Sequence, residues 1–405
     1  MNEKGEWRMS QQNSPYKTTE RVNGVVMSMI RTVMERTREM KEAGLPVIPF
    51  VAGEPNFDTP TEIKEAVIEA IRDNWSHYAS NCGVLALRQG IAARLLRETG
   101  VSYDPVSEVL VTSSGAEAIN NALTALLDPG DEVIIPSPAF VNYANVARII
   151  GAKPVEIPLH RENGMQIDID DLRAAITPKT KVIALNNPCN PTGVLYSHET
   201  LKAVCELACE RNLLVFSDEI YNNLVYDGNK FESAASFPGM KERTVIMNGF
   251  SKTFAMTGWR LGYLCAPKEI LKDILKVHQY STTSSPTFIQ VGVAKAMNTE
   301  GTEREIQTMI RAFAERRELV TQGFDRAGIS YIPPRGAFYC FADVSSTGLS
   351  GEEFCRRLLE EKYVAAVPGI GFGAECGDFV RFSYATDSES IKEGMKRIGD
   401  FVRSL

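Results

Sequence analysis

The stretch VLVTSSGAEAINNALTALLDPGDEVII, residues 109–135, decides the fold. Two short apolar runs, VLVT at 109–112 and EVII at 132–135, enclose a segment of helical periodicity that ends at DPGD. Apolar runs without alternation are typical of strands buried on both faces, and a helix between two such strands is typical of a parallel sheet. The stretch therefore predicts one strand–helix–strand unit of an α/β protein.

The same alternation continues to residue 266. Further apolar runs lie at 181–185, 213–217, 244–247 and 260–266, with helical segments at 139–150 and 198–212. This order predicts an α/β fold with a large, doubly wound and mostly parallel sheet that carries helices on both faces.

Charged, amphipathic segments flank this core. Residues 20–44 and 301–328 each predict a long amphipathic helix, and the chain from 329 has the short strands and helices of a smaller α+β domain. We expect a loose tail over residues 1–19 and an N-terminal segment over 20–60 that packs on the small domain. The large ligand-binding domain is expected over 61–300 and the small C-terminal domain over 301–405.

The composition is that of a globular protein long enough for two domains. The 405 residues are 44% hydrophobic and 23% charged, with a formal net charge of −7 and no basic block, so nucleic acid is not an expected partner. No apolar stretch approaches the roughly 20 residues that span a bilayer, and the polar N-terminus lacks a signal core. The eight cysteines show no CxxC spacing, which favours a cytoplasmic location without a disulfide or metal site.

Polar or Gly/Pro-rich segments directly follow four of the predicted strands. They are SSGA at 113–116, NNPCNPTG at 186–193, DEIY at 218–221 and NGFSK at 248–252. Ligands of doubly wound sheets bind beyond the carboxyl ends of the strands. These segments therefore predict one ligand site at that edge of the sheet.

Each of these residues also has an ordinary explanation. Ser114 could be a plain helix N-cap, Asp218 could cap the helix after it, and Lys252 could be a solvated surface charge. Together, however, a helix N-terminus and Arg260 suit a phosphate, a buried carboxylate suits a protonated ring nitrogen, and a desolvated lysine is a nucleophile for aldehydes. The ligand with these features is pyridoxal 5′-phosphate.

Six motifs carry a resemblance to a known family. VAGEPNFDTP, NPTG, SDEIY, SKTFAMTGWRLGY, GAFY and VRFSYA follow one another from residue 51. In them the chain resembles the class I (fold type I) PLP-dependent aminotransferases, in the branch similar to aspartate aminotransferase. The resemblance implies transfer of the α-amino group of an L-amino acid to a 2-oxo acid, with 2-oxoglutarate as the expected acceptor. It also implies a ping-pong mechanism and a homodimer with shared active sites.

The resemblance also implies roles for residues at the ring of the cofactor. Lys252 would form the Schiff base with the aldehyde and then move a proton between substrate and cofactor. Asp218 would pair with the pyridine nitrogen, and Asn190 and Tyr221 would bind the ring hydroxyl oxygen. Phe140 would stack on the ring.

Other matching positions concern the phosphate and the substrate. Arg381 would bind the substrate α-carboxylate, helped by the backbone of Gly53 and by Asn190. Tyr78 would reach the phosphate of the partner subunit. The remaining positions that match phosphate-binding residues of the family are Ser114, Gly115, Ala116, Ser251 and Arg260.

Two positions depart from the family pattern. Glu117 stands where relatives that use acidic substrates often have a lysine, and an acid there would repel a second carboxylate. Arg335 stands before GAFY in place of a serine, and its position favours a surface role.

Two other functions are compatible with parts of the pattern. One is a PLP-dependent C–S lyase on the same fold, and the other is a non-catalytic, PLP-sensing regulator, which needs a DNA-binding domain before this fold. The complete NPTG and VRFSYA motifs favour transfer over the lyase. The amino donor stays open among aspartate, aromatic and other amino acids.

Overall fold

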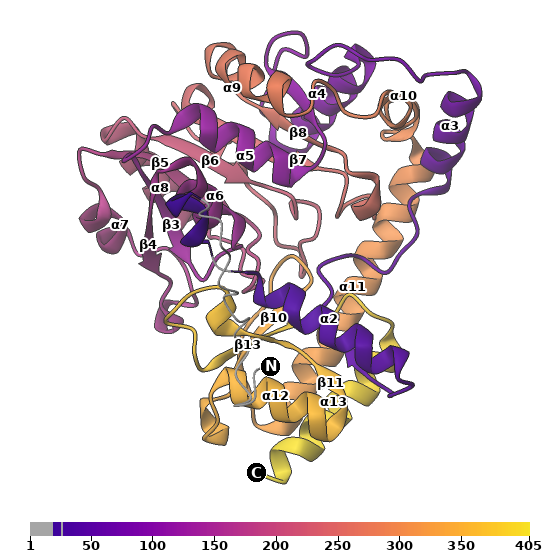
Figure 1. The fold of residues 1–405 in the computed structure, drawn as a ribbon, viewed down its shortest axis with the longest axis vertical. Helices are drawn as coiled ribbons and strands as arrows, with labels where there is room; N and C mark the ends of the chain where they lie inside the picture. The colour runs from indigo at the N-terminus through magenta and orange to yellow at the C-terminus, as the bar shows by residue number, and fades with distance from the viewer. Residues whose placement is uncertain (1–18, 26) are drawn as a thin grey trace.

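The described residues of this computed structural model are 19–25 and 27–405. They form a larger part built on a seven-stranded sheet and a smaller part at the C-terminal end (Figure 1). Helix α11, Glu300–Ala327, runs from the larger part into the smaller one. The tail expected over residues 1–19 lies, apart from Thr19, outside the described residues.

The large sheet has the strand order β2-β8-β7-β6-β5-β3-β4. Neighbours from β7 to β4 are parallel, whereas β8 runs antiparallel to both β2 and β7. The expected mostly parallel sheet is confirmed, with one antiparallel strand inside it. The strands are β2 (Val109–Thr112), β3 (Glu132–Ser137), β4 (Lys153–Pro158), β5 (Thr180–Asn186), β6 (Leu214–Asp218), β7 (Thr244–Gly249) and β8 (Gly262–Cys265).

Helices cover both faces of this sheet because its strands are apolar on both sides. In β3, Val133 and Ile135 belong to an apolar cluster with Ile119 of α5, whereas Ile134 lies in a cluster with Leu201 of α8. The helices of the larger part are α3 (Thr61–Arg72), α4 (Leu85–Thr99), α5 (Gly115–Leu126), α6 (Asn142–Ile150), α7 (Ile169–Ala175), α8 (His198–Glu210), α9 (Lys268–Ser281) and α10 (Thr287–Ala296). No helix in the described part of the chain is long and apolar enough to cross a membrane.

The smaller part is the expected α+β unit. A four-stranded antiparallel sheet has the order β12-β13-β10-β9, and β1 pairs with β11 in a separate parallel pair. Helix α13 packs against α11. The elements are β1 (Ile48–Pro49), β9 (Ser330–Ile332), β10 (Tyr339–Asp343), α12 (Gly351–Lys362), β11 (Val364–Ala365), β12 (Val367–Pro368), β13 (Phe379–Ser383) and α13 (Ser388–Arg403).

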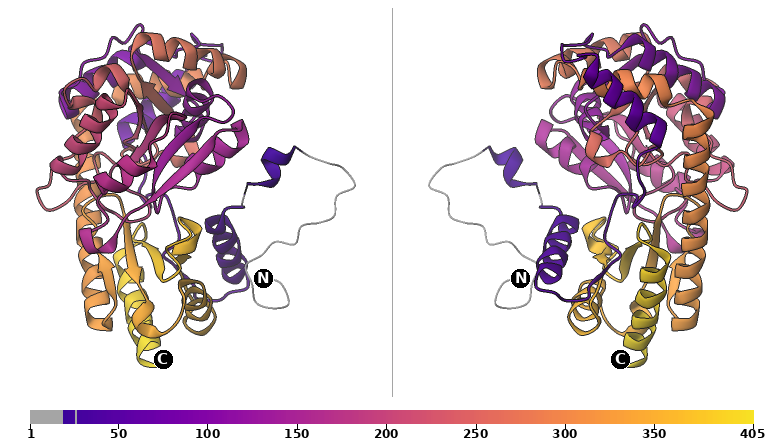
Figure 2. Two further views of the ribbon diagram at one scale, coloured as in Figure 1. Left: turned by 90° about the vertical axis from the view of Figure 1, so that its left-hand side faces the viewer. Right: turned by 90° about the vertical axis from the view of Figure 1, so that its right-hand side faces the viewer.

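The N-terminal segment differs from the prediction. The single helix expected over residues 20–44 is wrong, because α1, Glu20–Asn23, ends at Gly24 and α2, Met29–Glu42, starts afresh. Glycine is a poor helix former, so a short helix readily ends there. Helix α1 contacts α6 of the larger part, while α2 packs on β12 of the smaller one. Figure 2 shows α2 beside the C-terminal elements, on the side away from α11.

We propose domain boundaries at residues 60 and 300. The pairing of β1 with β11 and the packing of α2 on β12 support assigning residues 20–60 to the small domain. The boundary at 300 coincides with the start of α11.

Candidate functional site

A cavity of about 740 Å³ lies beyond the carboxyl ends of strands β5, β6 and β7. Loops that follow these strands form one side of it, and residues of β10, β13 and α2 form the other. Every site residue expected from the sequence lines this cavity except Tyr78. They are Gly53, Ser114, Gly115, Ala116, Phe140, Asn190, Asp218, Tyr221, Ser251, Lys252, Arg260 and Arg381.

Lys252 enters the cavity from the turn that follows β7. Its Nζ donates a hydrogen bond to the carbonyl oxygen of Gly53 and lies 5.9 Å from the ring centre of Tyr221 and 5.7 Å from that of Phe338. Burial lowers the pKa of the amine to about 8, against the opposing charge of Glu54. A fraction of this amine is therefore unprotonated near neutral pH, as a nucleophile requires.

Asp218 ends β6 and is buried. One of its oxygens accepts a hydrogen bond from the hydroxyl of Tyr143, and the other accepts one from the backbone N–H of Ile220 at 3.1 Å. Burial raises the pKa of the carboxyl to about 6, although both hydrogen bonds favour the ionised form. A cationic group beside Asp218 would therefore be stabilised more strongly than one at the surface.

The N-terminus of α5 faces the same cavity. The helix begins at Gly115 after Ser114, whose φ is 132° and whose hydroxyl accepts a hydrogen bond from the backbone N–H of Glu117 at 3.3 Å. The first N–H groups of a helix have no partner within the helix and attract anions. Arg260 adds a guanidinium to the cavity wall, with its Nη1 donating to the carbonyl oxygen of Thr257 at 2.9 Å.

Arg381 lies on β13 and is the largest fully buried side chain among the described residues, at 1% exposure. Its two terminal nitrogens donate to Oδ1 of Asn190 and to the carbonyl oxygen of Val51, each at 3.0 Å. The guanidinium carbon lies 4.5 Å from the ring centre of Tyr339. The Nε atom is buried without a hydrogen-bond partner, so donor capacity is left over.

Two tyrosines of the site were missed at the level of sequence. Tyr143 lies at the start of α6, three residues after Phe140, and this spacing could have brought both rings to the same site, since their centres are 5.8 Å apart. Tyr339 ends the GAFY motif, and its hydroxyl lies 2.9 Å from that of Tyr221. Tyr143 donates to Asp218 without lining the cavity, whereas Tyr339 lines the cavity and contacts Tyr221.

Tyr78 is 86% exposed and does not line the cavity of its own chain. Tyr280, at the end of α9, is equally exposed at 86%. The segments that carry them are joined, because Nδ2 of Asn81 donates to Oε1 of Gln279 at 3.5 Å. One part of the surface thus presents two tyrosines to the outside.

Glu117 does not line the cavity, so the repulsion of a second carboxylate expected there is not supported. Its Oε1 lies 2.7 Å from Nδ1 of the fully buried His278, and its other oxygen accepts from the backbone N–H of Ser113. Burial acts in the other direction, but these contacts hold the pKa of Glu117 below its usual range. Arg335 is exposed and lies outside the cavity, as a surface role predicts.

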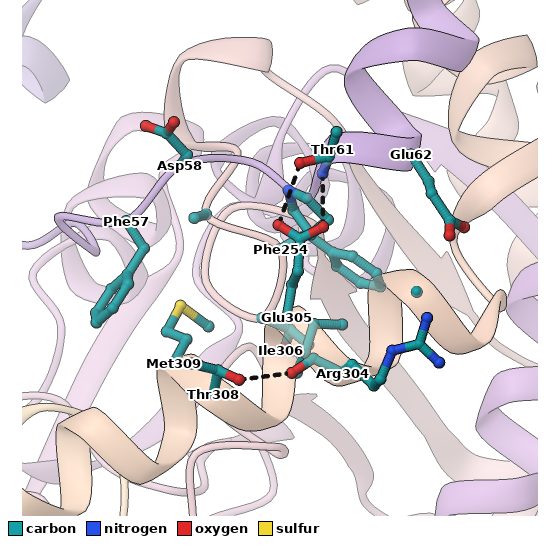
Figure 3. Close-up of a pocket in the computed structure, with 14 residues that line it drawn as sticks. Phe57, Asp58, Thr61, Glu62, Phe254, Arg304, Glu305, Ile306, Thr308 and Met309 are labelled. Atoms are coloured by element: carbon teal, nitrogen blue, oxygen red, sulfur yellow. Dashed lines mark hydrogen bonds between the residues drawn. The ribbon is translucent and has the colours of Figure 1, made fainter.

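A second cavity of about 550 Å³ lies between residues 57–62, residues 253–255 and the first half of α11 (Figure 3). Figure 3 shows Thr61 and Glu305 joined across it; the carboxylate of Glu305 accepts from the backbone N–H of Thr61 at 3.0 Å and so caps α3. None of the expected site residues lines this cavity. It therefore does not contribute to the site described above.

The residues of the larger cavity fit pyridoxal 5′-phosphate. An amine with a lowered pKa suits the aldehyde, a buried carboxylate suits the ring nitrogen, and a helix N-terminus beside Arg260 suits the phosphate. The arrangement places these three kinds of group on one cavity wall.

Comparisons with known proteins agree with this fit. The sequence model of the family described as Aminotransferase class I and II matches residues 46–398. An aspartate aminotransferase of Pyrococcus abyssi is 40% identical over 385 residues, 95% of this chain and 98% of that protein. The aromatic-amino-acid aminotransferase 2 of Thermococcus litoralis is 41% identical over 352 residues, 87% of this chain and 90% of that protein.

A solved structure extends the comparison to three dimensions. The aspartate aminotransferase from Thermus thermophilus with maleate superimposes with a TM-score of 0.91 at 38% identity, covering 96% of this chain and 100% of that chain.

Proposed function

Since the chain belongs to the family of class I and II aminotransferases, we propose how its own residues serve the reaction of that family. The protein is a transaminase that uses pyridoxal 5′-phosphate and moves an amino group from an L-amino acid to a 2-oxo acid. When bound, the cofactor supplies an aldehyde that takes up the amino group and a ring that accepts electrons. The lyase and the PLP-sensing regulator are not favoured by the named relatives.

The lysine in the cavity carries the proposal. Lys252 holds the cofactor covalently and, as a free amine, moves a proton at the substrate Cα. The supporting observation is its pKa of about 8 in the cavity that also contains Asp218 and Arg381. An amine with a pKa near the working pH can both accept and return a proton.

The other groups hold and orient the cofactor. Asp218 pairs with the ring nitrogen and is itself fixed by Tyr143. Asn190 and Tyr221 bind the ring hydroxyl oxygen, and Phe140 stacks on the ring. The phosphate is bound by Ser114, Gly115, Ala116, Ser251 and Arg260 and, from the partner subunit, by Tyr78.

Arg381 binds the α-carboxylate of the substrate. Its hydrogen bonds to Asn190 and Val51 fix the guanidinium before any substrate arrives, so little order has to be gained on binding. Two parallel N–H donors match the two oxygens of a carboxylate. The backbone of Gly53 lies in the same cavity and assists.

We assign aspartate as the donor and 2-oxoglutarate as the acceptor. The relatives named aspartate aminotransferase support this choice, and the relative named for aromatic amino acids supports a second activity toward aromatic donors. The protein acts as a cytoplasmic homodimer with shared active sites. Its eight free cysteines suit a reducing compartment.

The test is chemical labelling of Lys252. Borohydride treatment of the protein loaded with pyridoxal 5′-phosphate is expected to attach a pyridoxyl group to the peptide that contains Lys252, as read by mass spectrometry. Lys252→Ala should lose the label and the activity, whereas Lys276→Ala, at an exposed lysine of α9, should keep both. A wild-type protein without a label at this peptide would refute the proposal.

A further inference from the structure

Helix α2 contributes a wall to the cavity that the sequence motifs do not include. Its buried residues, Val33, Thr37 and Met40, follow one another at the spacing of a helix face and pack toward the protein. A second stripe of the same helix lines the cavity, and its members are Ile30, Arg31, Met34, Glu35 and Arg38. One side of α2 thus anchors the helix while the other faces the substrate space.

The arginines of the cavity differ in their partners. Arg381 bonds to Asn190 and Val51, and Arg260 lies with the phosphate-binding groups at the N-terminus of α5. Arg38 is paired with Glu35 on its own helix and lies 3.7 Å from the carboxylate of Glu42. Each of these arginines therefore already has a partner in the protein or a role assigned above.

Arg31 is different. It is exposed at the cavity, and its guanidinium makes no hydrogen bond, ion pair or ring contact with any residue in 19–25 or 27–405. An exposed guanidinium without a partner attracts anionic groups and can bind a carboxylate with two parallel hydrogen bonds. Among the described residues that line the cavity, Arg31 is thus the arginine whose guanidinium has no partner and no role assigned above.

The position of α2 suits a residue that contacts the side chain of the substrate. The helix packs on β12, and Val367 of β12 pairs in register with Arg381 of β13. The element that carries Arg31 therefore adjoins the sheet that carries the binder of the α-carboxylate. Glu117, the position at which relatives often have a lysine, is bound to His278 and is outside the cavity.

We infer that Arg31 selects substrates with a second carboxylate, by pairing its guanidinium with the distal carboxylate of a dicarboxylic amino acid or 2-oxo acid. This inference rests on the proposed transaminase function. Because Arg31 is exposed, its contribution is moderate and weakened by salt.

The experiment follows single half-reactions, so that the reaction with the amino donor is measured apart from the reaction with the 2-oxo acid. Wild-type protein and Arg31→Gln, both loaded with pyridoxal 5′-phosphate, are mixed with aspartate or with phenylalanine, and the absorbance of the cofactor is recorded over time. For Arg31→Gln, kcat/KM for aspartate should fall about 2- to 5-fold, the range for the loss of an exposed ion pair. The value for phenylalanine should be unchanged, and Arg31→Lys should restore part of the preference for aspartate.

Two further measurements separate pairing from a general effect on the helix. The dissociation constant of maleate, a dicarboxylate that does not react, should rise in Arg31→Gln by a similar factor. Added salt should lower the aspartate preference of the wild type and leave that of Arg31→Gln unchanged. Arg36→Gln is the matched control, since Arg36 lies on the same helix, pairs with Glu39 at 3.2 Å and does not line the cavity.

The outcomes are distinguishable. If Arg31→Gln reacts with aspartate as fast as the wild type, or slows with both donors alike, Arg31 is not a selector and the transaminase function stands. If neither aspartate nor phenylalanine changes the cofactor absorbance of the wild-type protein, the proposed function itself fails.

Discussion

At the scale of single residues, the site is governed by burial of ionisable groups. The pKa of Asp218 is raised to about 6 and that of Lys252 is lowered to about 8, and in both cases burial is the main cause. Burial disfavours whichever form is charged, so an acid and a base move toward each other on the pH scale. Without the cofactor, burial consequently destabilises the charged forms of both groups. A cationic ring beside Asp218 would stabilise its carboxylate.

The destabilised carboxylate predicts that Asp218→Asn stabilises the cofactor-free protein. The carboxyl binds its proton more tightly in the folded chain than in the unfolded one, where its pKa is 3.8, so its contribution to the free energy of unfolding falls as the pH rises from about 4 through 6. The loss above that window is roughly 3 kcal/mol. The cofactor-free Asn variant should therefore unfold at a higher temperature than the wild type near pH 8, with a smaller gain near pH 5, while its affinity for the cofactor decreases.

The control for this measurement is Asp400→Asn. Asp400 is a partly exposed carboxylate of α13 that pairs with Arg403 near the C-terminus, and its replacement should give no comparable gain. Calorimetry of the cofactor-free proteins at several pH values provides the comparison. A lower unfolding temperature of Asp218→Asn near pH 8 would contradict the assigned role of burial.

At the scale of elements, the phosphate loop depends on a close approach between α5 and β8. A Cβ atom on Gly262 of β8 would lie 2.7 Å from the carbonyl carbon of Ser114 and 2.8 Å from the backbone nitrogen of Gly115. These neighbours are backbone atoms, which cannot rotate aside as a side chain would. The antiparallel strand inside the sheet thus fixes the start of α5.

Gly262→Ala should accordingly displace the loop. We expect the free energy of unfolding to decrease by about 1–3 kcal/mol, as for other overpacked sites, and the dissociation constant of the cofactor to increase. Gly377→Ala is the matched control, because nothing lies within 4 Å of the Cβ that would be added there. Fluorescence titration with the cofactor and urea unfolding measure the two effects, and unchanged values for Gly262→Ala would show that the loop tolerates the methyl group.

Within the large sheet, element prediction failed in two places. Strand β4, Lys153–Pro158, was not predicted, because as an edge strand it has mostly exposed or half-exposed residues and so lacks an apolar run. The run at 260–266 was expected as a strand, but its antiparallel direction in β8 was not predicted. The apolarity of a run reports burial and does not report direction.

At the scale of the whole molecule, the cavity is formed where the two parts meet. Lys252 and Asp218 come from the larger part, whereas Arg381, Tyr339 and helix α2 come from the smaller one. Tyr78 is 86% exposed and does not line this cavity. If Tyr78 serves the proposed site, a second copy of the chain would have to supply it.

Hybrid dimers test this sharing. Tyr78→Ala and Lys252→Ala homodimers should each have reduced activity, but a mixture that is dissociated and reassociated should regain up to about one quarter of the wild-type value. The reason is that half of the dimers are hybrids, and in each hybrid one site combines an intact Lys252 with an intact Tyr78. A mixture that gains no activity would argue for separate sites.

The sequence by itself determined the doubly wound sheet and the groups at its carboxyl edge. Asp218 ends a buried strand, and Lys252 and the start of α5 each come three residues after one, so the covalent chain brings them to one edge once the strands pair. The six motifs added Arg381, which lies far along the chain from the others. These assignments needed only local pattern and order.

Only the tertiary structure decided which side of each helix meets the cavity. The amphipathic pattern of α2 says that one face is buried, but the position of Arg31 at the substrate space depends on the packing of α2 against β12. In the same way, Tyr143 reaches Asp218, and Glu117 turns to His278, through contacts between elements distant in sequence. The spacing of residues within an element fixes its own faces, whereas the neighbour that each face meets is set by how the elements pack together.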